Sequence, residues 1–169
     1  MNVRKIGKLF VMVLGCIVLM GCKTDPSGAL SFQEKECRFT AECKIKSEDK
    51  QVDDYVVEVL HRPDGSGEIV FLSPETIAGC KYLRTASGEY SFQAEDLIFP
   101  VAKNPSTEAI FSMFDLSEES IVKASTDEIS GESLNVLTFD GNITLYLGRN
   151  GYPLYYDHPN ITMTIQVTA

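Results

Sequence analysis

Residues 38–46 read R-F-T-A-E-C-K-I-K, and apolar and polar side chains alternate along the whole stretch. Phe39, Ala41 and Cys43 therefore share one face of an extended chain, while mainly charged side chains occupy the other. This period of two predicts a β-strand that is buried on one side only. Residues 160–168, N-I-T-M-T-I-Q-V-T, have the same alternation and predict a second such strand at the end of the chain.

The same alternation recurs between turn signals through most of the chain. Further strands are expected over residues 55–62, 68–72, 80–85, 89–94, 134–139, 142–147 and 152–156. The intervening turns are short and rich in Gly, Asp and Pro, so successive strands should pair as an antiparallel meander of about eight to ten strands. Pro153 predicts an edge or a bulge in its strand. The apolar run 98–101 is broken by Pro100, and no strand is assigned to it.

One segment, residues 106–120, has helical spacing. Pro105 precedes it, and Ser106 or Thr107 is expected to cap it. Its apolar side chains fall on one broad face. One helix of this length is too small to cover a sheet of eight or more strands. The fold class expected is therefore mainly β: a curved antiparallel sheet whose concave face is partly open, or which curls on itself, with one inserted helix as a plug or lid.

Composition limits the classes of function. The chain has 169 residues, is 44% hydrophobic and carries a formal charge of −9, which describes a folded acidic protein. An acidic balance argues against nucleic-acid binding. Two histidines exclude most histidine-based metal and nucleophile sites. No phosphate loop, dinucleotide fingerprint or nucleophile elbow occurs, so no catalysis, cofactor or metal is expected.

The N-terminus carries a targeting signal. Basic residues at 4, 5 and 8 precede an uncharged run over 9–21, which as a helix spans roughly 20 Å, too short to cross a bilayer. The run ends Leu19-Met20-Gly21-Cys22, which resembles the lipobox of bacterial lipoproteins. The resemblance implies cleavage before Cys22 and a diacylglycerol on its sulfur. The alternatives are a plain signal peptide with an incidental cysteine and an uncleaved short anchor.

This interpretation divides the chain into a signal peptide (1–21), a lipidated tether (22–31) and one β domain (32–169). Cleavage removes three basic residues and no acidic ones, so the net charge changes from −9 to −12. Anionic headgroups would repel such a domain, so the acyl chains must anchor it. The expected location is the extracytoplasmic face of the cell membrane.

Three cysteines follow Cys22. Cys37 and Cys43 lie six residues apart in one expected strand, roughly 20 Å when extended, which is too far for a disulfide. Cys80 could pair with either, and the odd number leaves at least one thiol unpaired. Small buried apolar side chains are the expected role of all three.

Several features together resemble one family. They are the lipobox, the strand meander, the S-P-E-T-I-A-G loop at 73–79, the mid-chain helix and G-Y-P at 151–153. In this combination the chain resembles the LolA/LolB-like proteins, and more closely the LolA-like lipoproteins of Gram-positive Clostridia, including the spore germination group. The resemblance implies an unclosed β-barrel with a helical lid over a hydrophobic cavity. Carriers of this family are unanchored, so a shuttle role does not transfer automatically to a lipidated chain, even if the fold does.

Two functions are expected. The first is binding of a lipid, acyl chain or apolar peptide on the concave face; the opposing possibility is that the same residues fill a solid core. The candidate lining residues are Phe39, Val57, Val59, Phe71, Tyr82, Phe92, Ile110, Phe114, Ile143, Leu145, Met163 and Ile165. The second is an anchored adaptor that holds or activates a cell-envelope or spore-cortex enzyme, as the resembled germination lipoproteins act by partnership.

Overall fold

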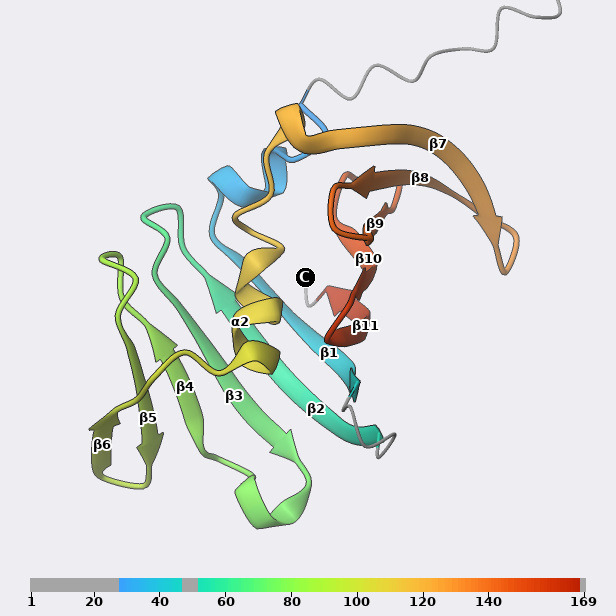
Figure 1. Cartoon of the computed structure of the whole chain (residues 1–169). Coiled ribbons are helices and arrows are strands. Elements are labelled where there is room, and N and C mark those ends of the chain that lie inside the picture. The colour runs from blue at the N-terminus through green and yellow to red at the C-terminus, as the bar shows by residue number, and fades with distance from the viewer. Residues whose placement is uncertain (1–27, 47–51, 168–169) are drawn as a thin grey trace, which may run out of the picture.

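A computed structural model describes residues 28–46 and 52–167. The described chain forms one antiparallel sheet of eleven strands (Figure 1). The strands are β1 (Cys37–Lys46), β2 (Val52–His61), β3 (Gly67–Ser73), β4 (Lys81–Arg84), β5 (Tyr90–Ala94), β6 (Leu97–Pro100), β7 (Ile121–Ile129), β8 (Glu132–Phe139), β9 (Ile143–Leu147), β10 (Pro153–His158) and β11 (Ile161–Val167). The helix is α2 (Pro105–Ser112), and the 3-10 turns are η1 (Ser31–Glu34), η2 (Glu75–Ile77) and η3 (Glu118–Ser120).

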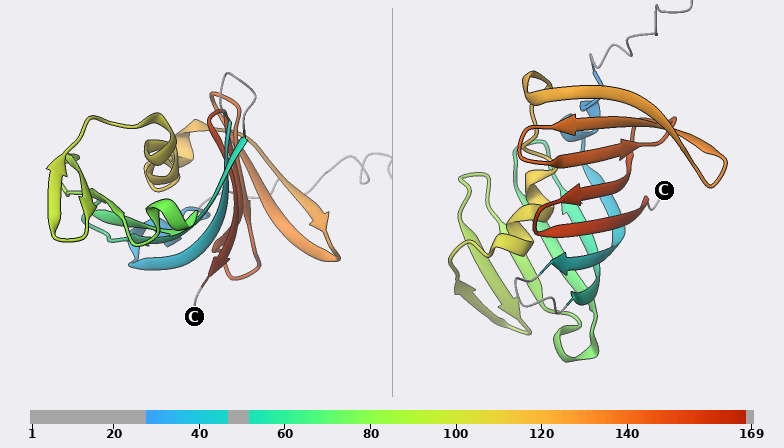
Figure 2. Two further views of the ribbon diagram at one scale, coloured as in Figure 1. Left: turned by 90° about the horizontal axis from the view of Figure 1, so that it is seen from below. Right: turned by 45° about the vertical axis from the view of Figure 1, so that its right-hand side comes forward.

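The sheet consists of two meanders joined by its first and last strands. The order across the sheet is β6-β5-β4-β3-β2-β1-β11-β10-β9-β8-β7. Antiparallel pairing of β1 with β11 joins the two meanders. The sheet curves but β6 and β7 do not pair, so the barrel stays open (Figure 2). The expected architecture, a curved unclosed antiparallel sheet with one inserted helix, is confirmed.

Eleven strands exceed the expected eight to ten, because β6 and β7 were not assigned from the sequence. Both are edge strands of the sheet. No residue of β6 is buried, and β7 buries none of its side chains fully. Strands without a buried face carry no alternation that a sequence pattern could detect.

The helix is shorter than expected, and its cap is a different residue. It ends at Ser112 rather than near residue 120, and the Asn104 side chain accepts hydrogen bonds from the amides of Ser106 and Thr107. Beyond the helix, the Gln33 side chain donates to the carbonyls of Met113 (3.0 Å) and Leu116 (3.2 Å). These bonds satisfy carbonyls that a longer helix would have used internally, which lets the chain turn away.

The concave face and α2 form the core. Ile110, Phe111, Met113 and Phe114 are all buried against the sheet. Figure 2 shows α2 lying inside the curve of the sheet. A bulge in β10 between Pro153 and Tyr155 agrees with the expectation for Pro153, although β10 lies inside the sheet and not at its edge.

In the described chain Cys37, Cys43 and Cys80 are free thiols, and the expected burial is confirmed for Cys37 and Cys43 but not for Cys80, which is only half-buried. Cys37 and Cys43 are buried, and burial raises the pKa of the Cys43 thiol to about 12. The signal peptide, most of the tether and Cys22 lie outside the described residues. Among the residues that are described, no helix is long and apolar enough to cross a membrane.

The register of β11 gives a direct test of the core. Ile165 is 3% exposed and pairs with Ala41, whereas its neighbour Gln166 is exposed and pairs with Thr40. Ile165→Asp places a charge in the core without a partner and should lower the free energy of unfolding by roughly 3 kcal/mol or more. Gln166→Asp should change it by less than about 0.5 kcal/mol. Denaturant unfolding measures both, and equal effects of the two substitutions would contradict this register.

Candidate functional site

One row of side chains runs across the concave face from the core to the β6 edge. Strand pairing aligns Phe39, Val59, Ile69, Tyr82, Phe92 and Phe99 on β1 to β6. The first three are fully buried and Tyr82 is 4% exposed. Phe92 is half-buried and Phe99 is 47% exposed. The concave face is therefore covered at β1 to β4 and open at β5 and β6.

The gradient follows from where α2 and Phe114, two residues after its last residue, make their contacts. Phe114 stacks on Phe39 of β1 and on His61 of β2. Phe111 lies over Gly67 of β3 and packs beside Tyr90 at the start of β5. Beyond that point exposure rises along the row, from half-buried Phe92 to Phe99 at 47%. Phe92, Ala94, Leu97 and Phe99 form what we call the open apolar end, because their pairing places them on the same concave side.

Gly67 brings α2 close to the sheet. A Cβ atom at this position would lie 2.6 Å from Cε1 of Phe111 and 2.9 Å from the Leu60 carbonyl oxygen. Only glycine leaves room for the Phe111 ring to rest on the β3 backbone. Gly67 directly precedes the expected strand 68–72, and no sequence signal distinguishes a turn glycine from one that gives room to a ring.

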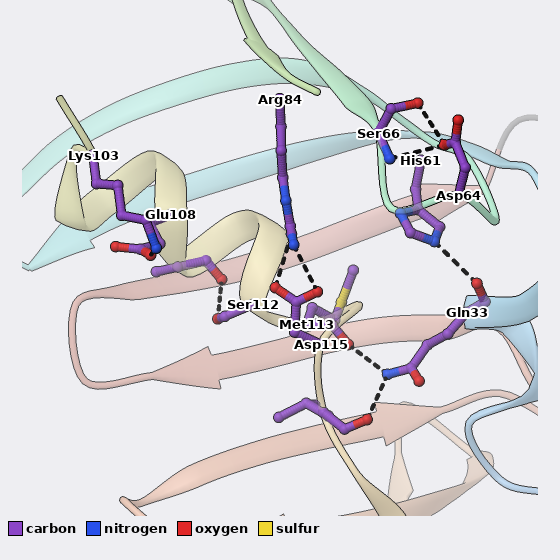
Figure 3. Close-up of polar contacts among 12 residues, drawn as sticks. Gln33, His61, Asp64, Ser66, Arg84, Lys103, Glu108, Ser112, Met113 and Asp115 are labelled. Carbon is purple, nitrogen blue, oxygen red and sulfur yellow. Dashed lines mark hydrogen bonds and ion pairs between the residues drawn. The ribbon is translucent and has the colours of Figure 1, made fainter. Parts of the chain in front are cut away.

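Polar contacts fix the C-terminal end of α2 (Figure 3). Arg84 of β4 donates two hydrogen bonds to the Asp115 carboxylate, at 2.8 and 3.0 Å, a bidentate geometry that is stronger than a single contact. Ser112 lies 2.9 Å from the Tyr156 hydroxyl, and Gln33 holds the two carbonyls that follow the helix. Two strands of the sheet and η1 therefore hold the helix in place.

Residues 101–104, which we call the strap, lead from β6 to α2 and are fixed over Tyr82. The Tyr82 hydroxyl donates to the Ala102 carbonyl (3.2 Å) and accepts from the Asn104 amide (3.1 Å). Lys103 pairs with Glu108 at 2.7 Å, and its ammonium lies 5.7 Å from the centre of the Tyr90 ring. The strap therefore keeps the N-terminal end of α2 beside β4 and β5.

An open groove of about 650 Å³ lies where the strap leaves β6. Its lining residues are Thr85, Gly88, Glu89, Tyr90, Ser91, Ile98, Pro100, Val101, Ala102 and Lys103. Among the residues that the structure describes, no cluster of three or more His, Cys, Asp or Glu side chains could hold a metal ion.

His61 is buried beneath α2, a role that sequence reasoning missed. Its ring stacks on Phe114 with centroids 4.0 Å apart, and Nε2 lies 3.0 Å from the Gln33 carbonyl oxygen. Nδ1 is buried and has no hydrogen-bond partner among the described residues. Burial lowers the pKa of His61, and the bond to Gln33 and the nearby Asp115 charge oppose that shift only in part.

The structure places the twelve predicted lining residues in two groups. Ten are buried in one core cluster, and Phe92 and Ile143 are half-buried at its margin. Only Phe92 belongs to the open apolar end. Leu97 and Phe99, which complete it, were missed because Pro100 interrupted their apolar run. Ligand contact by any of these residues stays a prediction.

No protein-family profile matches the chain, and no curated protein matches it. Solved structures with a similar outline include an uncharacterized conserved protein from Thermus thermophilus, with 11% identity, TM-score 0.49 and coverage of 85% of this chain and 88% of that one. A LolA superfamily protein from Nitrosomonas europaea has 9% identity and a TM-score of 0.42, and the match covers 85% of this chain and 91% of that one. A putative outer membrane lipoprotein-sorting protein domain from Vibrio parahaemolyticus has 10% identity and a TM-score of 0.41, and the match covers 85% of this chain and 88% of that one. At these identities and scores function has to be inferred from this chain's own residues.

Burial of His61 predicts an acid-sensitive stability. Because the folded-state pKa lies below the ordinary value near 6.5, the unfolded chain binds the proton more readily as pH falls. The stability that neutral His61 contributes is therefore present above about pH 6.5 and is lost at lower pH. His61→Phe keeps a ring on Phe114 without a titrating group.

We expect the free energy of unfolding of the wild type to fall more between pH 7.5 and pH 5 than that of His61→Phe, as measured by urea unfolding. His158, whose pKa burial also lowers, is present in both proteins and cancels in the comparison. Parallel pH curves for the two proteins would contradict this role of His61.

Proposed function

We propose that this chain binds the apolar part of a lipid, acyl-chain or peptide ligand at the open apolar end of its concave face, without catalysis. The observation that carries the proposal is the exposure gradient along one row, from fully buried Phe39 to Phe99 at 47%. A continuous apolar surface that starts in the core and ends in water, on a concave face, is typical of a binding site.

Ligand burial would supply the binding energy. Covering one large apolar side chain contributes about 1.5–3 kcal/mol, and both Phe99 and Leu97, which is 63% exposed, remain uncovered. Binding at this place needs no polar group of the protein, because the four side chains of the open apolar end, Phe92, Ala94, Leu97 and Phe99, are all apolar. A ligand that offers mainly hydrocarbon fits such a floor.

The helix need not move for a ligand to enter. Arg84, Gln33 and Tyr82 hold α2 and the strap in place, while Leu97 and Phe99 of the open apolar end stay exposed. In this proposal α2 is a fixed plug that completes the core under β1 to β4. The ligand extends the same apolar row toward β6.

We further propose that diacylglycerol on Cys22 holds the domain at the extracytoplasmic face of the cell membrane. Six residues after Cys22, the described chain begins at Gly28, whose amide donates to Glu118 at 2.8 Å. A span of six residues reaches at most about 22 Å. The η1 and η3 side of the domain would thus stay near the membrane surface, and a lipid ligand would be close at hand.

Binding of a fluorescent fatty acid, dansyl-undecanoic acid, tests the open apolar end. Phe99→Ser should weaken binding roughly tenfold, because the substitution removes an apolar side chain that the ligand would cover. Leu72→Ser is a matched control, because Leu72 is also 47% exposed but follows the concave-facing Phe71 and so points to the other side of β3. It should bind the probe like the wild type.

Phe114→Ala supplies the opposite control, since Phe114 packs on the covered part of the row. Its truncation should cost roughly 3–5 kcal/mol of stability, as large-to-small changes in packed cores do. Phe99→Ser should cost far less, because its side chain is half exposed. Equal probe affinities for the wild type, Phe99→Ser and Leu72→Ser would show that the ligand does not use this surface.

Cys22→Ala tests the anchor separately from the ligand site. The variant should lose lipidation and remain an uncleaved precursor or leave the membrane fraction. Mass spectrometry of the protein from the detergent phase measures both effects. A processed mass together with unchanged detergent partitioning would contradict lipidation at Cys22.

A further inference from the structure

We propose that β6 is a docking strand for a partner protein: an extended, apolar segment flanked by Lys or Arg adds to the free edge of the sheet beside Ile98. This goes beyond the ligand site above, because it uses the backbone edge of β6 and the side of the strand opposite to the open apolar end. It would give the anchored domain a protein partner as well as an apolar ligand.

The backbone of β6 has hydrogen-bonding groups directed outward. The Val101 amide donates to the Tyr90 carbonyl at 3.1 Å, and the same register pairs Phe99 with Phe92 and Leu97 with Ala94. In an antiparallel ladder the backbone amides and carbonyls of these alternate residues point to the neighbouring strand. The backbone groups of Ile98 and Pro100 therefore point the other way. Pro100 consequently removes no ladder bond, and the amide and carbonyl of Ile98 are directed to the edge of the sheet.

The side chains of β6 suit a strand partner and do little to exclude one. Leu97, Ile98 and Phe99 are 63%, 60% and 47% exposed, and the strand has no charged residue. Proteins usually protect a free edge with charges or cover it with another element. The opposite edge strand, β7, follows that rule with Lys123, Asp127 and Glu128. Val122 of β7 is also 65% exposed, but only β6 of the two edge strands combines three exposed apolar side chains with no charged residue, which indicates a surface that a partner covers.

Charge identifies the kind of partner. Glu95 and Asp96 form the turn into β6, and Glu89 lines the groove beyond its end; all three are exposed. The nearby cation Lys103 is already paired with Glu108. A second copy of this acidic chain would bring like charges together, whereas flanking Lys or Arg residues would meet these carboxylates. The groove of about 650 Å³ next to Ile98 and Pro100 can receive a side chain that follows the added strand.

Amide hydrogen exchange, measured residue by residue on the isotope-labelled protein, tests the proposal. The probe is the capped peptide Lys-Lys-Val-Thr-Val-Thr-Val-Lys-Lys. At saturation the Ile98 amide should exchange at least tenfold more slowly, and the Phe99 amide, already directed to β5, should change little. Ile98→Pro removes the outward amide at a position that makes no ladder bond, and should abolish peptide binding measured by fluorescence anisotropy. Ile98→Val should bind like the wild type.

Two controls separate this proposal from the ligand site and from misfolding. Ile98→Pro should still bind dansyl-undecanoic acid, which shows that the domain is folded, and Phe99→Ser should still show slowed exchange at Ile98 with the peptide. The proposal is overturned if Ile98→Pro binds the peptide normally, or if protection appears in β7 instead. It is equally overturned if a peptide with Glu in place of Lys binds as well, or if sedimentation shows self-association through Ile98.

Discussion

The packing of α2 on the concave face is the interaction on which the rest of the structure depends. An unclosed sheet has one face that must be covered to form a core, and the only α-helix in the described chain covers part of it. Phe111 reaches the β3 backbone because Gly67 has no side chain, and Phe114 stacks on His61. Bonds from Arg84 and Gln33 then hold the end of the helix, so the apolar contacts are made in one arrangement only.

The limited length of this helix produces both surfaces that we interpret functionally. Eight residues cannot cover a sheet of eleven strands, and α2 with the residues that follow it contacts β1, β2, β3, β10, β11 and the start of β5. The apolar row continues past it to Phe92 and Phe99, and β6 is left at the edge of the sheet. Leu97 and Phe99 point to the concave face, whereas the Ile98 side chain points to the opposite face and its amide and carbonyl point to the free edge. The two proposals thus use different sides of one strand.

The sequence by itself determined the strands with one buried face, since alternation in residues 38–46 and 160–168 records directly which side chains leave water. It also determined the antiparallel connections, through short turns, and the existence of a single amphipathic helix. It predicted a set of apolar candidates but not which of them would be covered. The edge strands β6 and β7 were missed because a strand with no buried face has no period to detect.

Tertiary structure alone decided the remainder. Whether Phe39 or Phe99 faces solvent depends on where α2 packs, and that depends on Gly67, Arg84 and Gln33, residues far apart in the chain. The buried state of His61 likewise arises from its stacking on Phe114, which is distant in sequence. Local patterns encode which side chains prefer burial, whereas long-range packing determines how much apolar surface one short helix can cover and how much stays exposed.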